Sequence, residues 1–548
     1  GREVGGLANM LACHLDIENP EHRDAVQGFW SSPAMAPKPG LKAVDMFDAV
    51  EDGRIKALWI ICTNPAVSMP EADRVAKAIA ACPFVVVSDM FADTDTARLA
   101  DVFLPATGWA EKDGTVTNSE RCISRQRGIL PAPGEARPDW QAICDVARAM
   151  GWGEGFAFDG PAAIFDEYAR LSGVAGALGR DFDISGLAGM DRAGYDAMAP
   201  QVWPVSATRQ GGRFFAKGGF FTPDGRGRML ALTARAPMSA TSAEFPLRLN
   251  TGRVRDHWHT LTRTGLSPRL SQHIAEPFLE MHPKDAAARG LKPAELVEVA
   301  SPHGTALLRL VVTDRQRPGS VFAPMHWTGS FAAKGRVDAL VEANTDPVSG
   351  QPESKASPVE VRAMAPAWYG FAVSLAEPVS GAAYWAKARA GSGWRMELAG
   401  TGTPADWETF ARDLFVRDGS TPEAVTLSDP ARGVARVALS DGGRVIAALF
   451  IARDPVAAAR SHLIGSLAMG SATDLLAGRP GGDRPDPGAT VCSCLNVGIN
   501  TIIAAIETGR LMDVEAIGAA TGAGTNCGSC KAELRNILIS TRVEEAAQ

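Results

Sequence analysis

Four cysteines near the C-terminus place the strongest constraint on how this chain can fold. Cys492, Cys494, Cys527 and Cys530 lie in the runs VCSCLNV and GTNCGSC, with the spacing C-x-C-x32-C-x2-C. Two close pairs on either side of a helical spacer predict a thiolate cage, and thiolates suit zinc or iron–sulfur rather than calcium or magnesium. The other five cysteines are scattered, which disfavours a disulfide framework and favours a reduced chain. A zinc knuckle and a pair of disulfides remain alternatives to an iron–sulfur centre.

The composition excludes several classes of partner. A length of 548 residues predicts several domains, and the net charge of −7 gives no reason to expect nucleic acid or an anionic membrane surface. No stretch approaches the roughly 18 uninterrupted apolar residues of a membrane-spanning helix. The opening GREVGGLANML has neither an initiator Met nor the basic-then-apolar order of a signal peptide. We therefore expect a cytoplasmic protein whose chain begins inside a domain.

Residues from about 40 to 150 predict an α/β fold with a doubly wound parallel sheet. The runs ALWIIC (57–62), FVVV (84–87) and VFL (102–104) predict buried strands, and 71–82 predicts a helix between the first two. Such sheets bind ligands at the carboxyl ends of their strands. Asn64 in the TNP loop follows the first strand, and Ser88 and Asp89 follow the second. No GxGxxG accompanies them, so an ordinary NAD site is not supported.

The rest of the chain divides by its pattern of strands and turns. Residues 161–172 predict a helix, short strands from 245 to about 362 predict a small β-barrel, and VARVALSDGGRVIAALFIA predicts a hairpin. RPGGDRPDPG (479–488) has the composition of a linker. We expect five parts: an α/β domain at 1–175, an irregular connection at 176–244, a barrel at 245–362, an accessory α+β region at 363–484 and a small helical metal-binding domain at 485–548.

Three longer runs carry a family resemblance. LADVFLPATGWAEKDGTVTNSERCISRQRGILPAPGEARPDW (99–140), NTGRVRDHWHTLTRTG (250–265) and TDPVSGQPESK (345–355) resemble, in order, motifs of the bis-molybdopterin guanine dinucleotide oxidoreductases. The cysteine module resembles the 2Fe-2S domain of bacterioferritin-associated ferredoxin. The combination resembles the catalytic subunits of prokaryotic assimilatory nitrate reductases. This resemblance implies a dinucleotide-binding sheet, a double-psi barrel that clamps both pterins, and an electron-transfer cluster at the C-terminus.

The resemblance also implies cofactor-contacting residues. One guanosine and its phosphates would lie against the sheet, with Lys112 near phosphate and Asp139 near a guanine edge. The barrel loop would contact the other dinucleotide and the pterins, and Lys355 would be a late contact. The expected cofactor-binding residues are Asn64, Ser88, Asp89, Lys112, Asp139, Asn250, Thr251, Gly252, Arg253, His257, Trp258, His259 and Lys355; the expected metal ligands are Cys492, Cys494, Cys527 and Cys530.

Several residues depart from the family pattern or leave their role open. His257 and His259 could form a metal pair, but hydrogen bonding to the cofactor is favoured, and for His326 core packing and cofactor contact are both open. Asp338 stands where relatives carry an asparagine, and an acid beside a pterin or phosphate would be unfavourable. Apolar surroundings predict a core position for Cys13, Cys62, Cys82 and Cys144, and Cys122 is expected to be a small buried residue.

The resemblance implies molybdenum-dependent reduction of nitrate to nitrite. Relatives also carry a 4Fe-4S site and a side chain that reaches molybdenum; these would lie upstream of residue 1, so no catalytic residue is assigned. The electron donor would be a ferredoxin, a flavodoxin or an NAD(P)H-dependent reductase subunit. A formate dehydrogenase or another oxyanion oxidoreductase of the same family is an alternative, as is a non-catalytic fragment that retains only the electron-transfer module.

Overall fold

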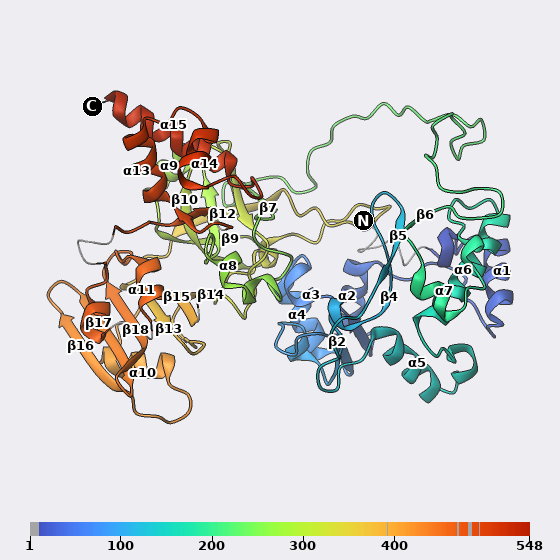
Figure 1. Cartoon of the computed structure of the whole chain (residues 1–548), viewed down its shortest axis with the longest axis horizontal. Coiled ribbons are helices and arrows are strands. Elements are labelled where there is room, and N and C mark those ends of the chain that lie inside the picture. The colour runs from blue at the N-terminus through green and yellow to red at the C-terminus, as the bar shows by residue number, and fades with distance from the viewer. Residues whose placement is uncertain (1–9, 392, 468–470, 481–484, 493, 548) are drawn as a thin grey trace. The chain divides into compact units, whose positions relative to one another are not determined.

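The computed structural model describes residues 10–391, 393–467, 471–480, 485–492 and 494–547. They fall into two compact units, each assembled from separate stretches of chain. Unit 1 comprises residues 1–64, 75–238 and 343–353, and unit 2 comprises 65–74, 239–342 and 354–548. Figure 1 shows the elements in chain order from blue to red. No helix in the described part of the chain is long and apolar enough to cross a membrane.

A parallel sheet of three strands forms the part of unit 1 that matters for function. Its order is β1 (Leu58–Ile61), β2 (Val85–Asp89) and β3 (Val102–Pro105), which confirms the predicted strands. The predicted helix between the first two strands is also confirmed as α4 (Ala72–Ala81), preceded by the short α3 (Pro65–Ser68). Parallel pairing brings the carboxyl ends of β1 and β2 to one edge, where the polar loops lie.

The rest of unit 1 is helical with a small antiparallel sheet. Its core is built on apolar side chains that include Leu15, Phe165 and Tyr195. Residues 343–353 return to this unit, where Lys42 Nζ donates to the carbonyl oxygens of Pro347 at 3.1 Å and Val348 at 2.5 Å. The elements are α1 (Pro20–Trp30), α2 (Ala43–Glu51), β4 (Gly114–Thr117), β5 (Cys122–Gln126), α5 (Asp139–Ala149), α6 (Pro161–Ala177), α7 (Arg192–Ala197) and β6 (Gln201–Val202).

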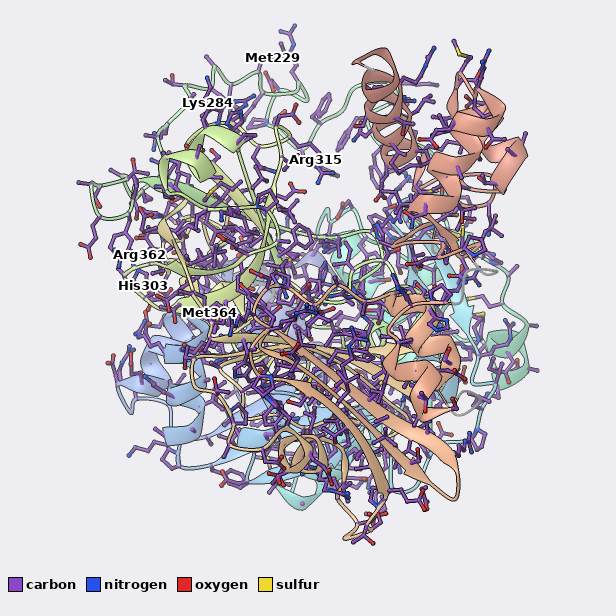
Figure 2. The ribbon with its side chains drawn as sticks, turned by 90° about the vertical axis from the view of Figure 1, so that its left-hand side faces the viewer. Met229, Lys284, His303, Arg315, Arg362 and Met364 are labelled. Carbon is purple, nitrogen blue, oxygen red and sulfur yellow. The ribbon has the colours of Figure 1, made fainter. Side chains whose placement is uncertain are left out.

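Unit 2 contains a closed six-stranded barrel in the order β10-β8-β11-β7-β12-β9. Two neighbouring pairs are parallel (β7 with β11, β8 with β10) and the other four are antiparallel, and inward apolar positions such as Leu249, Leu279 and Val299 fill the interior. Lys284, Arg315 and Arg362 project from the barrel surface (Figure 2). The elements are β7 (Leu247–Gly252), α8 (Pro268–Ser271), β8 (Phe278–Met281), α9 (Pro283–Ala288), β9 (Leu296–Ala300), β10 (Thr305–Val312), β11 (Ser320–Pro324) and β12 (Ser357–Ala363).

An antiparallel sheet of six strands follows the barrel, in the order β14-β15-β13-β18-β17-β16. The predicted hairpin is confirmed as β17 and β18, with Gly442 and Gly443 at positive φ in the turn. The sheet is larger than the sequence pattern suggested. The elements are β13 (Trp368–Ser374), β14 (Tyr384–Ala390), β15 (Gly393–Gly400), α10 (Trp407–Phe415), β16 (Glu423–Asp429), β17 (Val434–Asp441), β18 (Arg444–Ala452), α11 (Arg460–Ser466) and α12 (Ala472–Leu476).

The C-terminal module is a small helical domain with its own core. Ile502, Ile517 and Leu534 pack there together with Cys492 and Cys530. The Asp513 side chain caps the second helix by accepting from the Ala516 N–H at 2.7 Å. The elements are β19 (Thr490–Cys492), β20 (Val497–Gly498), α13 (Ile499–Gly509), α14 (Val514–Thr521) and α15 (Lys531–Ala547). The helical spacer predicted between the cysteine pairs is confirmed as α13 and α14, and α15 follows the second pair.

Candidate cofactor sites

Two of the predicted sheet-edge residues support the loops that carry them. Asn64 is buried, and its Oδ1 accepts from the Thr96 N–H at 3.2 Å and the Thr96 hydroxyl at 2.7 Å. The Ser88 hydroxyl accepts from the indole N–H of Trp59 at 2.9 Å. These bonds fix the backbone at the ends of β1 and β2, where N–H groups can face a phosphate.

The other three predicted residues of unit 1 gather into one charged cluster. Lys112 Nζ lies 2.9 Å from Asp139 Oδ2, and Asp139 begins helix α5. The Asp89 carboxylate accepts from the Met90 N–H at 2.6 Å, and burial raises its pKa, with the nearby charge of Asp139 adding to the effect. Two carboxylates and one lysine therefore lie together. Such a site can accept hydrogen bonds from a base through its carboxylates and can hold a phosphate through its lysine.

Cys62 corrects one prediction. Cys13, Cys82 and Cys144 are buried as expected, but Cys62 is exposed, and its Sγ lies 3.5 Å from Asp139 Oδ1. The backbone takes φ 54° there, so the chain leaves β1 at this residue instead of continuing into the apolar layer. Cys122 is only half-buried. All nine cysteines are free thiols, with no disulfide.

The barrel loop begins at the end of β7 and leaves several polar side chains exposed. Asn250, Arg253 and His259 are exposed, and the Arg253 guanidinium lies 5.0 Å from the ring centre of Trp258. A side chain at Gly252 would place its Cβ 2.6 Å from Phe322 Cε2, so any larger residue there would force the Phe322 ring to shift. The Thr251 hydroxyl donates to the Ser354 carbonyl at 2.8 Å, and Lys355 Nζ donates to the Thr251 carbonyl. Lys355 is thereby held beside the loop.

Buried histidines fix the shape of this loop. His326 is fully buried; its Nε2 accepts from the Val254 N–H at 3.0 Å, and its Nδ1 lies 2.6 Å from the His259 carbonyl oxygen. Burial lowers the pKa of His326 to about 4, so the imidazole is neutral. A neutral imidazole has one donor and one acceptor nitrogen, which matches these two contacts. His257 Nε2 contacts the Ile274 carbonyl at 3.1 Å, whereas its buried Nδ1 has no hydrogen-bond partner within the described residues. That atom fits a polar cofactor group at the loop.

The carboxyl group of Asp338 is compatible with its buried position because it can be protonated there. The residue is buried, and burial raises the pKa of its carboxyl to about 7, while the charge of Lys355 acts in the opposite direction. A protonated carboxyl presents a donor and an acceptor, as an asparagine does. The acid is therefore compatible with a neighbouring anion at neutral pH or below.

The raised pKa predicts a pH-dependent stability. Because the folded state binds the Asp338 proton more tightly than the unfolded state, the free energy of unfolding should fall as pH rises from about 4 to about 7, by up to about 4 kcal/mol. Denaturant unfolding of the wild type and of Asp338→Asn at several pH values in this window measures the contribution. In Asp338→Asn, the free energy of unfolding should fall less steeply with pH than in the wild type. The same pH dependence in both proteins would contradict the prediction.

The four predicted metal ligands come together in the C-terminal module. Sγ of Cys494 lies 3.6 Å from that of Cys492 and 3.8 Å from that of Cys527, and the thiol of Cys530 is hydrogen-bonded to that of Cys492. Cys492 and Cys530 are buried and Cys527 is exposed. Within the described residues, no three His, Cys, Asp or Glu side chains are arranged around a single metal position. The sulfurs form a linked row of close pairs.

Backbone N–H groups point at these sulfurs, as ligands of an anionic cluster require. Burial disfavours the Cys492 thiolate, but N–H donors from Gly524 and Leu495 outweigh it and lower its pKa. Gly524 takes φ 81°, a conformation that favours glycine and lets its N–H approach. The side chain and backbone of Ser529 likewise lower the pKa of Cys527. This donor set fits an iron–sulfur cluster.

Charged residues beside the cysteines were not predicted. Arg255, Asp256 and Arg269 line the same cavity as the four cysteines, and His273 and Glu533 join them through hydrogen bonds. The signal present in the sequence was the charged run RVRD after Gly252. Nothing local indicated that its charges face a segment more than 200 positions away.

Three family models match the chain. Residues 2–149 match the model described as "Molybdopterin oxidoreductase", residues 247–358 match "Molydopterin dinucleotide binding domain", and residues 490–540 match "BFD-like [2Fe-2S] binding domain". The first covers the parallel sheet, the second the barrel with its loop, and the third the cysteine cage.

Curated relatives are similar along much of the chain. A nitrate reductase of Klebsiella oxytoca is 42% identical across 98% of this chain, which spans 61% of that relative. An assimilatory nitrate reductase catalytic subunit of Bacillus subtilis is 34% identical across 66% of this chain and 49% of its own length. An F420-dependent formate dehydrogenase subunit alpha of Methanocaldococcus jannaschii is 32% identical across 66% and 50%. The chain thus spans about half to three-fifths of these relatives.

The sheet edge, the barrel loop and the cysteine cage each coincide with a matching model, and the models name both cofactors that these sites fit. Two stretches of the chain thus resemble domains of molybdopterin oxidoreductases, its C-terminal end resembles a BFD-like [2Fe-2S] domain, and the chain as a whole is similar to nitrate reductases.

Proposed function

We propose that this chain is part of an enzyme that reduces nitrate to nitrite for assimilation, with electrons entering through the C-terminal 2Fe-2S cluster. The proposal depends on the length of one alignment. The Klebsiella oxytoca nitrate reductase aligns with 98% of the chain, which includes the cysteine module. The formate dehydrogenase similarity covers 66% of the chain, so formate oxidation is the second candidate.

The cofactor roles of individual residues are part of this proposal. Asn64, Ser88, Asp89, Lys112 and Asp139 would hold one guanosine and its phosphates. Asn250, Thr251, Gly252, Arg253, His257, Trp258, His259 and Lys355 would hold the second dinucleotide and the pterins, and the four cysteines the cluster. When bound, molybdenum supplies oxygen-atom transfer and the cluster supplies one-electron transfer. The chain's own residues bind the anionic groups and orient them.

The finer architecture follows from the same proposal. The closed barrel would be a double-psi barrel, and the three parallel strands would belong to a doubly wound dinucleotide-binding sheet. The five parts at 1–175, 176–244, 245–362, 363–484 and 485–548 would be the domains and their connections. A cytoplasmic location and a ferredoxin, flavodoxin or NAD(P)H-dependent donor are proposed with them.

Purified protein from its native source should form nitrite from nitrate when a reduced viologen dye supplies electrons, and should not oxidise formate with the oxidised dye. Protein from cells grown with tungstate in place of molybdate is the matched control and should form little nitrite. Formate oxidation without nitrite formation would favour the second candidate. Absence of both activities in protein that contains molybdenum would contradict an enzymatic role with either substrate.

A further inference from the structure

The cysteine cage is closed on one side by residues of the barrel loop and of the segment that follows it. A cavity of about 280 Å³ lies between them in unit 2. Its walls come from positions more than 200 residues apart: Arg255, Asp256, Arg269 and Leu270 on one side, and Cys492, Cys494, Cys527, Ser529 and Cys530 on the other. The module therefore does not complete the surroundings of its sulfurs alone.

Two arginines hold the first cysteine arm by its backbone. Arg255 Nη2 donates to the Val491 carbonyl at 2.7 Å, and Arg269 Nη2 donates to the Cys494 carbonyl. Val491 directly precedes Cys492, so both ends of the C-x-C arm are fixed by a guanidinium. A guanidinium remains charged in proteins and offers several donors in a rigid fork.

The second cysteine arm is held through helix α15. His273 Nδ1 lies 2.6 Å from Asp256 Oδ2, and its Nε2 lies 3.3 Å from an oxygen of Glu533, in the first turn after Cys530. Burial disfavours the imidazolium, but the hydrogen bonds to Asp256 and Glu533 outweigh it and raise the pKa of His273 to about 9. Three cations, Arg255, Arg269 and His273, thus accompany two carboxylates beside the cysteines.

We propose that Arg255 and Arg269 are positioning residues for the cluster: they hold the C-x-C arm against the barrel, and their charges raise the reduction potential of the bound cluster. Adding an electron increases the negative charge of a thiolate-bound cluster, so neighbouring positive charge stabilises the reduced form. This inference rests on the proposed 2Fe-2S cluster. It also links the two cofactor sites, because Arg255 lies two residues after Arg253.

The first test is a redox titration of the whole protein monitored by the paramagnetic signal of the reduced 2Fe-2S cluster. Arg255→Gln and Arg269→Gln should each shift the one-electron equilibrium toward the oxidised form by roughly tenfold, which is about 59 mV to more negative potential. Arg255→Lys keeps the charge and should lie near the wild type. Arg362→Gln, an exposed barrel arginine (Figure 2), is the matched control and should not shift the potential. Wild-type potentials in both Gln variants would overturn the role of charge.

The second test does not depend on the cluster. Hydrogen–deuterium exchange at the amides of Val491, Cys492 and Cys494 should be faster in the Arg255→Gln and Arg269→Gln proteins than in Arg362→Gln, because their arm loses its anchor. If both Arg255→Gln and Arg269→Gln exchange these amides at the same rate as Arg362→Gln, the positioning role is overturned. This conclusion holds even if one of the variants has lost its iron. If wild-type protein contains zinc and no acid-labile sulfide, the cluster assignment fails, whereas the exchange comparison still decides the positioning role.

Discussion

Cys492→Ser is expected to remove most of the iron and acid-labile sulfide from the protein and to loosen the C-terminal helices. Cys492 is only 1% exposed and packs in the core of the module beside Ile502 and Leu534. A domain of this size obtains part of its folding free energy from its metal centre. Wild-type protein prepared without oxygen should hold about two irons and two sulfides per chain and show a one-electron reduced paramagnetic signal.

The matched control for this substitution is Cys122→Ser. Cys122 is half-buried, lies in unit 1 and is outside the cage, so its replacement should leave iron, sulfide and the paramagnetic signal unchanged. Iron and sulfide analysis, together with hydrogen exchange across α13, α14 and α15, measures both expected effects. One tightly held zinc and no labile sulfide in the wild type would favour the zinc alternative. Full iron content in Cys492→Ser would exclude this residue as a ligand.

Arg253→Ala is expected to lower the molybdenum and guanine content of the purified protein. An exposed guanidinium at the end of β7 can make a charge-assisted bond to phosphate, worth about 1.5–3 kcal/mol or roughly 10- to 150-fold in affinity. Metal analysis and guanine released by acid, each per mole of protein, measure the loss. Arg362→Ala removes an exposed arginine from the same barrel and should retain the wild-type content. Wild-type content in Arg253→Ala would remove its proposed role.

Local sequence patterns predicted those strands, turns and ligand pairs whose signal is contained within a few neighbouring residues. ALWIIC and FVVV are short apolar runs bounded by turns, and they form paired parallel strands. Each cysteine pair marked one side of the cage because its two thiols lie within three positions of one another, and Gly442 and Gly443 marked the turn of the β17–β18 hairpin. In each case the signal lies within one short run of sequence.

The features that were missed depend on contacts between distant segments. Cys62 belongs to an apolar run, but the turn at the end of β1 leaves it exposed beside Asp139. The high pKa of Asp338 arises from burial by the folded barrel, which no neighbour in sequence indicates. The His273–Glu533 contact joins residues 260 positions apart. Most strands of the six-stranded sheet were also missed because an alternating strand such as β14 resembles many exposed segments until its partners are known.

The interleaved course of the chain has a consequence for dissecting the protein. Unit 1 takes residues 343–353 from between two stretches of unit 2, and unit 2 takes residues 65–74 from between two stretches of unit 1. A gene divided at any single point between codons 65 and 353 would therefore encode two fragments, and at least one unit would lack a part found only on the other polypeptide. Shortened expression products should be chosen by complete units and not by contiguous sequence.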